Sequence, residues 1–400
     1  MSTKKIHAQP PEKLTGIEFK KIPSSAVGYK AIKSAITHIK EEVGLVKGIG
    51  LLAKLNQKNG FDCPGCAWPD PDEKRAFLAE YCENGAKAVA EEATKNRVSP
   101  LFFATHSISK LSELSDYEIG KKGRITHPVV VYEGRDHYEE ISWEDAFNMI
   151  GKELKSLPSP DEAIFYTSGR TSNEAAFLYQ LFVRKFGTNN LPDCSNMCHE
   201  SSGAALTETL GIGKGSVTLD DFNHAELVIV MGQNPGTNHP RMLSALGETK
   251  KRGGKIITIN PLPEVGLMRY NDPQNPIKWM WKGQKLTDVF LQVKINGDVA
   301  LLKIILKLLW QKEQETPGTI FDHEFIKTNT TGYEDFITDV ETYSIEKLIP
   351  QTGIDFRIIE EAATLIAQKK KIIICWAMGL TQHKNSVDNI RELVNLLLLK

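Results

Sequence analysis

The sequence has almost no net charge and no long uninterrupted hydrophobic run. Its 49 basic and 50 acidic residues give a formal net charge of −1. A chain so balanced has no overall basic field for a phosphate backbone, so we do not expect nucleic acid as a partner. The longest apolar stretch, LLKIILKLLW, is short and broken by lysines, which predicts a helix with a buried stripe and no membrane span.

The N-terminal residues, MSTKKIHAQP, contain a basic pair but no apolar segment behind it and no twin arginine. We therefore expect no export signal and a cytoplasmic location. Residues 1–45 are polar and rich in lysine, which predicts an extended leader without chemistry of its own. The 400 residues are 41% hydrophobic and 25% charged, as in a soluble globular protein of two or three domains.

Cysteine is also scarce, since six cysteines in 400 residues are too few for a disulfide framework. Three of them, Cys63, Cys66 and Cys82, lie within twenty positions of one another, which favours metal or redox chemistry. The C-x-x-C spacing folds two sulfurs to one side of a tight turn, and Cys82 is close enough to add a third bond. Zinc and an iron–sulfur cluster would both want a fourth ligand, for which Asp70 offers a carboxylate, and the residues alone leave both readings open.

Beyond residue 115, apolar runs alternate with helical patterns. ELVIVMG and KIITIN, with a helix between them, are typical of parallel strands joined by a right-handed crossover, and KKIIICWAMG followed by NSVDNIRELVNLLLLK repeats the scheme. HPVVVYEG and HYEE predict a strand pair before a helix opened by Ser142, and EAIFYTSG predicts a strand before a glycine turn and a further helix. The predicted fold class is α/β, with parallel-sheet Rossmann-like domains.

The loops that follow these strands contain neither a G-x-G-x-x-G motif nor a Walker A motif. Four of them, SGRTSNE, GQNPGTNHP, NPLPEVG and MGLTQH, are rich in glycine, asparagine and threonine. Ligands of such sheets bind at these loops, outside the carboxyl ends of the strands. Together the four loops indicate backbone and amide donors for a ligand that carries phosphate groups and a base.

The stretch DCSNMCHESSG places Cys194 and Cys198 four residues apart, with His199 directly after the second. The spacing alone allows a metal site, a thiol nucleophile or two buried structural cysteines. A cysteine hydrolase is disfavoured, because a histidine next to a thiol in sequence seldom orients onto it.

In order, FDCPGCAWPDP, CSNMCHE, GQNPGTNHP, a strand ending in INP, LQVKINGDVALLK and MGLTQH resemble the catalytic subunit of the molybdopterin-guanine-dinucleotide oxidoreductases. The sequence is most similar to the formate-dehydrogenase-like alpha subunits of the YdeP type. This resemblance covers residues from about 25 to 400. It implies that a small iron–sulfur-binding domain precedes the Rossmann-like domains.

The resemblance also implies a two-electron redox reaction of a small substrate at a bis(molybdopterin guanine dinucleotide) molybdenum centre. Electrons would pass through a [4Fe-4S] cluster to a possible electron-transfer protein partner. Cys198 would be the thiolate ligand of molybdenum and His199 would relay the substrate proton, while Cys63, Cys66 and Cys82 would hold the cluster. The expected cofactor contacts are Lys87, Asn173, Glu174, Gly232, Asn234, Asn260, Gly297, Asp298 and Gln382.

The sequence departs from the family pattern at three places. Asp70 stands where the wider family has its third cluster cysteine, and Asn84 replaces a lysine between cluster and pterin, for which Lys87 is the nearest substitute. The strand end Asp-Pro-Arg of many relatives reads Asn260-Pro261-Leu262 here.

The resemblance suggests a domain plan for a chain that lacks the C-terminal half of its family. We expect a leader at 1–45, a cluster domain at 46–115, the first part of one molybdopterin-dinucleotide domain at 116–193 and a second, Rossmann-like one at 194–400, with the final β-barrel domain absent. The alternative is an inactive or truncated module that binds a nucleotide or zinc and acts by interaction.

Overall fold

The computed structural model describes residues 23–66, 68–72, 75–76, 79–275 and 283–400. The chain divides into two compact units. Among the described residues, the first unit comprises 34–65 and 84–192, and the second comprises 23–33, 66–83 and 193–400. The first 22 residues of the expected leader lie outside the described part of the chain, and its described remainder is not extended, because Gly28–Glu42 form a helix.

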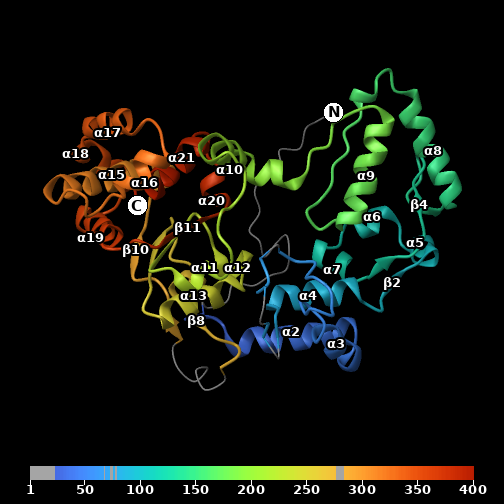
Figure 1. The fold of residues 1–400 in the computed structure, drawn as a ribbon. Coiled ribbons are helices and arrows are strands. Elements are labelled where there is room, and N and C mark those ends of the chain that lie inside the picture. Colours follow the sequence, from blue (N-terminus) through green and yellow to red (C-terminus); the bar gives the residue numbers. More distant parts are fainter. Residues whose placement is uncertain (1–22, 67, 73–74, 77–78, 276–282) are drawn as a thin grey trace. The chain divides into compact units, whose positions relative to one another are not determined.

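The first unit consists of short helices and two small strand pairs (Figure 1). Strands β2 and β3 pair in parallel, and β4 and β5 pair antiparallel. The chain passes from the second unit to the first within α2, after residue 33, and again within α4, after residue 83. The elements are α2 (Gly28–Glu42), α3 (Leu45–Leu52), α4 (Glu83–Glu92), β2 (Arg97–Val98), α5 (Pro100–Thr105), α6 (Ile108–Leu111), α7 (Asp116–Gly120), β3 (Arg124–Ile125), β4 (Val129–Val130), β5 (Glu139–Glu140), α8 (Trp143–Ser156), the 3-10 helix η1 (Pro160–Glu162) and α9 (Asn173–Phe186).

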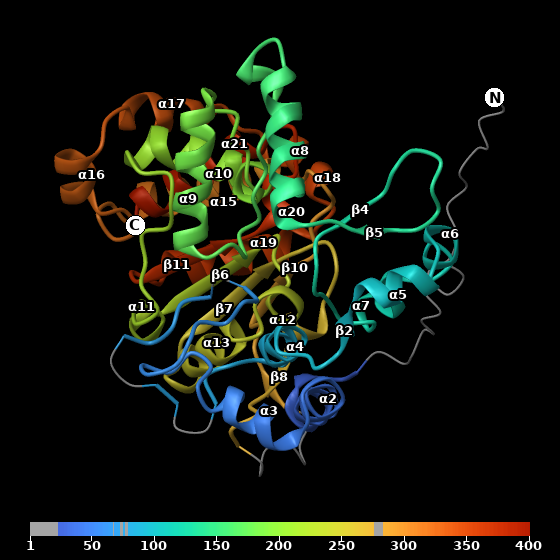
Figure 2. The same cartoon turned by 90° about the vertical axis from the view of Figure 1, so that its right-hand side faces the viewer.

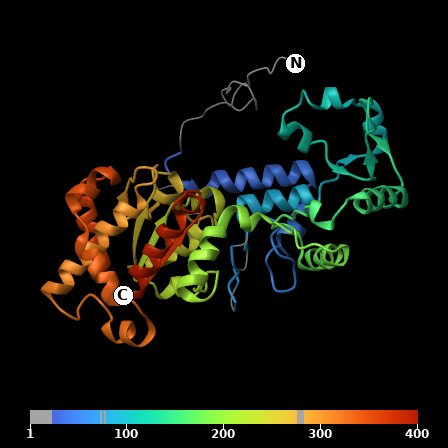
Figure 3. The ribbon, with the colours of Figure 1, turned by 90° about the horizontal axis from the view of Figure 1, so that it is seen from above.

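Within this unit, the C-terminal part of α2 lies beside α4, as the dark blue and cyan helices of Figure 3 show. The buried carboxylate of Glu42 accepts a hydrogen bond of 2.7 Å from Thr94 Oγ1 and one of 2.5 Å from Lys121 Nζ. A buried carboxylate is costly unless it is paired, so these two donors account for its position.

The strand pair and the helix predicted around Ser142 are confirmed, but the strand predicted at EAIFYTSG is wrong. Ser142 caps α8 by accepting a hydrogen bond from Asp145 N at 3.0 Å. Residues 163–166 form no strand, although Phe165 N donates to Asn190 O at 2.9 Å. An apolar run becomes a strand only where a neighbouring strand forms a continuous ladder of hydrogen bonds with it. In the described part of this unit, the segment has only isolated backbone hydrogen bonds.

The second unit is built on a parallel sheet in the order β10-β7-β6-β11 (Figure 1). A smaller sheet joins β1, β8 and β9. The strands are β1 (Ala26–Val27), β6 (Leu227–Met231), β7 (Lys255–Ile259), β8 (Arg269–Asn271), β9 (Gln284–Lys285), β10 (Val289–Leu291) and β11 (Ile372–Trp376). The helices are α10 (Cys194–Leu210), α11 (Asp221–His224), α12 (Pro235–Asn238), α13 (Met242–Lys251), α14 (Val265–Met268), α15 (Asp298–Glu315), α16 (His323–Asn329), α17 (Tyr333–Thr342), α18 (Ile345–Thr352), α19 (Phe356–Ala367), α20 (Met378–Thr381) and α21 (Ser386–Leu398).

Alternate side chains of β6 enter two different cores. Leu227, Ile229 and Met231 pack with the helices α10, α15, α19 and α21, whereas Val228 and Val230 pack with α13. Figure 2 shows α13 on one side of β6 and β7 and α15 on the other. A sheet covered on both faces explains why its strands are almost continuously apolar in sequence.

The predicted α/β class with parallel strands is confirmed, and LLKIILKLLW forms part of α15. In the described part of the chain, no helix has the length and apolar character needed to cross a membrane.

A buried carboxylate at the end of α15 fixes the loop that follows. Glu313, with 2% of its surface exposed, accepts hydrogen bonds from the backbone N–H groups of Gly318, Ile320 and Phe321. Its Oε1 also lies 2.6 Å from Nε2 of His323. Burial by itself would raise the pKa of Glu313, but these hydrogen bonds outweigh it and lower the pKa below the ordinary 4.5.

We expect Glu313→Gln to lower the free energy of unfolding by about 2 kcal/mol at pH 7, because charged acceptors of buried N–H groups are lost. Since the folded pKa is lowered, the stabilisation is complete above the ordinary carboxyl pKa and is lost as the pH falls through the folded value. Urea unfolding at pH 7 and at stepwise lower pH measures both effects. The exposed Glu315→Gln on the same helix is the control, and an equal loss in both variants would contradict the assignment.

Candidate active site

Helix α10 begins at a capping box formed by residues of the DCSNMCHE stretch. The Asp193 carboxylate accepts hydrogen bonds from Ser195 N at 2.8 Å and from Asn196 N at 3.2 Å. Asn196 Oδ1 in turn accepts from Asp193 N at 3.1 Å. This reciprocal cap starts the helix at Cys194 and places Cys198 one turn later.

The helix is interrupted directly after Cys198. His199 has φ −135° and ψ 18°, which lies outside the helical region. The carbonyls beside this kink are bound by side chains of the chain segment after β11: Thr381 Oγ1 donates to Cys198 O at 2.6 Å, and Gln382 Nε2 donates to Met197 O at 3.1 Å. These bonds satisfy carbonyl groups at the interruption and fix the Cys198 backbone.

The half-buried Cys198 lines an open pocket of about 330 Å³. Cys198 forms no disulfide with any residue that the structure describes. Because α20 follows β11, the pocket adjoins the carboxyl end of a parallel strand, where ligands of such sheets bind. Its lining residues are Asn196, Met197, Cys198, Glu200, Ser201, Ala204, Thr381 and Val387.

The imidazole of His199 is held by a buried serine. Ser202 Oγ accepts a hydrogen bond from Trp376 Nε1 at 3.0 Å and lies 3.2 Å from His199 Nδ1. An indole N–H can only donate, whereas the serine hydroxyl can donate to Nδ1 or accept from it, so the direction of this bond follows the tautomer of the ring. Partial burial of the ring lowers the pKa of His199, so it is neutral at pH 7.

A second thiol near this end of β11 is chemically different. Cys375 lies on the strand next to Trp376, and burial raises the pKa of its thiol to about 12. The thiol is therefore fully protonated at neutral pH and is a poor metal ligand.

The loops after β6 and β11 meet through two glycines. Gly232 has φ 56°, and its carbonyl accepts a hydrogen bond of 2.9 Å from Gly379 N. A Cβ atom on Gly232 would lie 2.7 Å from Leu380 N, so no larger residue fits without displacing backbone. This close approach brings two of the four loops singled out in the sequence together.

A similar contact joins the loop after β6 to α14. A Cβ atom on Gly236 would lie 2.8 Å from Gly266 Cα. Asn234 precedes α12 at this contact, and neighbouring Gln233 is buried with no hydrogen-bond partner for Oε1 among the described residues. A buried amide oxygen without a partner is rare in folded proteins, so this oxygen has a free acceptor position among the described residues.

Asp298 opens α15 directly after Gly297, and only 5% of its surface is exposed. Burial raises the pKa of this carboxyl, and the charge of His383 opposes the shift in part. Asn260, at the end of β7, uses its amide locally and donates to Leu262 O at 2.8 Å. The six candidate contacts from Gly232 to Gln382 therefore all lie in the second unit, together with Cys198 and His199.

The remaining candidates lie in the first unit or are divided between the units. Asn173 and Glu174 are exposed in the first turn of α9, and the half-buried Lys87 is on α4, all within the first unit. Cys63 belongs to the first unit, whereas Cys66 and Cys82 belong to the second. Among the residues that the structure describes, no three histidine, cysteine or acidic side chains form a group that could hold a metal ion.

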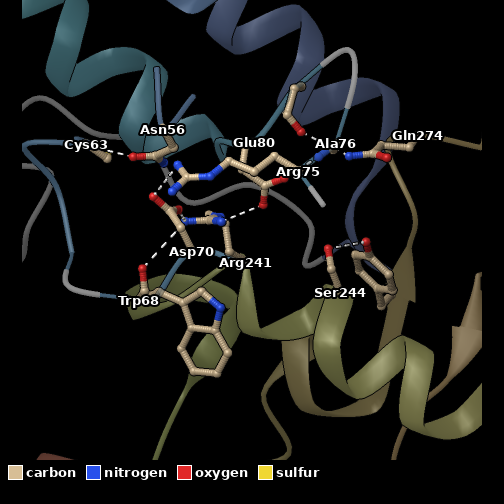
Figure 4. A network of polar contacts seen from close by, with 12 residues as sticks. Asn56, Cys63, Trp68, Asp70, Arg75, Ala76, Glu80, Arg241, Ser244 and Gln274 are labelled. Carbon is tan, nitrogen blue, oxygen red and sulfur yellow. Dashed lines mark hydrogen bonds and ion pairs between the residues drawn. The ribbon is translucent and has the colours of Figure 1, made fainter. Parts of the chain in front are cut away.

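The turn at Cys63 is closely held within the first unit. Its backbone N–H donates to Asn56 Oδ1 at 2.8 Å, a contact drawn in Figure 4, and its Sγ accepts from Gly65 N at 3.3 Å. Arg170, from the SGRTSNE loop, donates through Nε to Pro64 O at 2.7 Å. A backbone donor to sulfur is the type of contact that stabilises thiolate ligands of iron–sulfur clusters.

Sequence reasoning missed Thr381, Ser202 and Trp376. Thr381 lies inside the MGLTQH loop, where only Gln382 had been singled out. Ser202 lies in the DCSNMCHESSG stretch, three residues after His199, but its contact with Trp376 spans 174 residues and has no signal in the sequence.

We expect Thr381→Val to lower the free energy of unfolding by about 1–2 kcal/mol, since the Cys198 carbonyl loses its donor. Alkylation of Cys198, followed by peptide mass spectrometry, should become faster as the kink loosens. Thr381→Ser keeps the hydroxyl and should behave like the wild type. If valine and serine gave the same alkylation rate, the hydrogen bond would not fix Cys198.

Several known proteins are similar to this chain. A protein of Mycobacterium tuberculosis (strain ATCC 25618 / H37Rv), named an uncharacterized oxidoreductase, is 50% identical over 375 residues, covering 94% of this chain and 48% of its own. Protein YdeP of Escherichia coli (strain K12) is 44% identical over 392 residues, covering 95% of this chain and 51% of its own. The chain thus spans about half the length of these relatives.

A more distant relative is the alpha subunit of F420-dependent formate dehydrogenase 1 from Methanococcus maripaludis, 29% identical over 261 residues, which are 65% of this chain and 35% of that subunit. Among solved structures, acetylene hydratase from Pelobacter acetylenicus matches with a TM-score of 0.56 at 21% identity. The match covers 68% of this chain and 35% of the hydratase, and it shows that the two share a fold. The model of the molybdopterin oxidoreductase family matches residues 124–400, and the chain belongs to that family.

Proposed function

We propose that this chain is part of a formate-dehydrogenase-like oxidoreductase in which Cys198 is the thiolate ligand of molybdenum. The observation that carries the proposal is the position of Cys198. It lines the pocket at the carboxyl end of β11, on a kink fixed by Thr381, and its neighbour is a histidine. A soft thiolate suits a redox-active metal, and an adjacent neutral imidazole suits proton transfer.

The surrounding residues fit a dinucleotide form of the cofactor. Gly232 lets the loops after β6 and β11 approach closely through their backbones, and Gln233 Oε1 is buried without a partner among the described residues. Asp298 is a buried carboxylate that could accept hydrogen bonds from the paired N–H donors of a guanine edge. These features support molybdopterin guanine dinucleotide, with Asn234, Asn260, Gly297 and Gln382 as further contacts.

The bound cofactor would supply two-electron redox chemistry. The chain would supply a thiolate at Cys198 and a proton acceptor at His199. The neutral imidazole can take a proton on its unprotonated ring nitrogen, while Ser202 Oγ holds the ring at Nδ1. Thr381 and Gln382 would keep the backbone of the kink in place during this transfer.

We also propose a [4Fe-4S] cluster held by Cys63, Cys66 and Cys82, from which electrons pass to a protein partner. The hydrogen bond from Gly65 N to Cys63 Sγ supports this role for Cys63. Lys87, Asn173 and Glu174 would be cofactor contacts of the first unit. The proposed domain plan remains that of the sequence: cluster domain at 46–115 and dinucleotide domains at 116–193 and 194–400, in a cytoplasmic enzyme.

The substrate class is proposed from likeness to the formate dehydrogenase subunit, and small molecules of the formate type are the first to test. Since the curated relatives extend to about twice this length, metal and pterin analysis should compare this chain with a longer form. The alternative, an inactive module that binds zinc or a nucleotide, predicts zinc and no pterin in both forms.

We expect Cys198→Ser to replace one sulfur ligand of molybdenum by oxygen, because the serine hydroxyl stands where the thiolate would bind. Molybdenum X-ray absorption of protein from a molybdenum-replete host detects this change in sulfur ligation. Cys194→Ser, one helical turn away, is the matched control and should keep the wild-type spectrum. Identical spectra of the wild type and Cys198→Ser would exclude Cys198 as a ligand.

We expect Cys63→Ser or Cys66→Ser to abolish the brown absorbance and to lower iron and sulfide, because each cysteine would ligate the cluster. Cys375→Ala removes a buried thiol elsewhere and should keep both. A colourless wild-type protein that contains zinc would refute the cluster and favour the interaction module.

A further inference from the structure

A single guanidinium group joins two carboxylates that lie ten residues apart near Cys66 and Cys82. Arg241 Nη1 is 2.6 Å from Asp70 Oδ1, and Arg241 Nη2 is 2.5 Å from Glu80 Oε1 (Figure 4). Asp70 is four residues after Cys66, and Glu80 is two residues before Cys82. One side chain therefore closes the loop between the two cysteines, and all of these residues belong to the second unit.

The other carboxylate oxygens are also engaged. Asp70 Oδ2 accepts a hydrogen bond from Arg75 Nη1 at 3.0 Å, and Glu80 Oε2 accepts from Ala76 N at 2.7 Å. The side chains of Arg241, Asp70 and Glu80 are only 12%, 17% and 12% exposed. Ion pairs so shielded from water are disrupted at high cost when one partner is removed.

Arg241 is itself fixed by the sheet layer. It directly precedes α13, whose Met242, Leu243 and Leu246 are buried against the sheet. The ring of Trp68 packs edge-on to Phe222 of the same core, with ring centroids 5.8 Å apart. The cysteine segment is thus attached to the helical layer by a charge network and by an aromatic contact.

We propose that Arg241 is a positioning residue that closes the Cys66–Cys82 loop, and that Asp70 is its counter-ion and not a ligand to iron. The part that concerns iron rests on the proposed cluster. Asp70 stands where the family has a third cluster cysteine, but its two oxygens are bound by guanidinium groups. If this carboxylate bound iron instead, Arg241 would lose one of its two carboxylate partners in a site shielded from water.

Loop closure by Arg241 needs no metal, so it can be tested on the chain as purified. Hydrogen–deuterium exchange of peptides from 66–82 should become roughly tenfold faster in Arg241→Gln and in Asp70→Asn, as expected for loss of a shielded ion pair. Arg252→Gln, at the other end of α13, is the matched control and should leave these peptides unchanged. Arg241→Lys should give an intermediate rate, because an ammonium group cannot bridge two carboxylates as a fork does.

Comparison of the single variants separates the two roles of Asp70. If Asp70 is a counter-ion, Asp70→Asn should lose no more iron than Arg241→Gln, because both variants break the same ion pair. Iron lost in Asp70→Asn but retained in Arg241→Gln would overturn the proposal.

The iron content and the deuterium exchange rates of 66–82 also separate this inference from the proposed function. A wild-type chain without iron would count against the cluster, while the exchange rates of 66–82 would still decide loop closure. Unchanged rates in Arg241→Gln and Asp70→Asn would refute loop closure even in a protein that binds iron.

Discussion

The second unit depends on the position of β6 in the middle of its sheet. The strand is hydrogen-bonded to β7 on one edge and to β11 on the other, and all five of its residues are buried. Because these strands are parallel, their carboxyl ends meet at one edge, and the loops that follow must approach one another there. The contact of Gly232 with Gly379 and the contact of Thr381 with Cys198 both result from this arrangement.

The central strands could be predicted from sequence because burial on both faces leaves a strong signal, a run of β-branched and apolar residues bounded by turn residues. The same rule failed at EAIFYTSG, where apolar character is present but a complete ladder is not. Hydrophobicity indicates that a segment is suited to a sheet, whereas strand formation also requires a neighbour. The capped start of α8 at Ser142 was predictable because its signal is local.

For a related reason, only part of the candidate site could be predicted from the sequence. Cys198 and His199 attract notice because they are reactive side chains in a recognisable stretch. Their supports are Thr381, which lies 183 residues away from Cys198, and Trp376, which lies 174 residues away from Ser202. Such partners have no spacing rule, because the sheet and not the local chain brings them together. The same holds for Arg241, which meets Asp70 across 171 residues.

Desolvation also makes the unit's thiols chemically unequal. A soft metal binds the thiolate form of cysteine, so only a thiol that can ionise is a good ligand. Burial raises the pKa of Cys375 to about 12, so this thiol stays protonated at neutral pH. Cys198, which lines an open pocket one helix away, has access to solvent. The environment of β11 alone thus keeps Cys375 protonated at neutral pH, and no separate element is needed to mask this thiol.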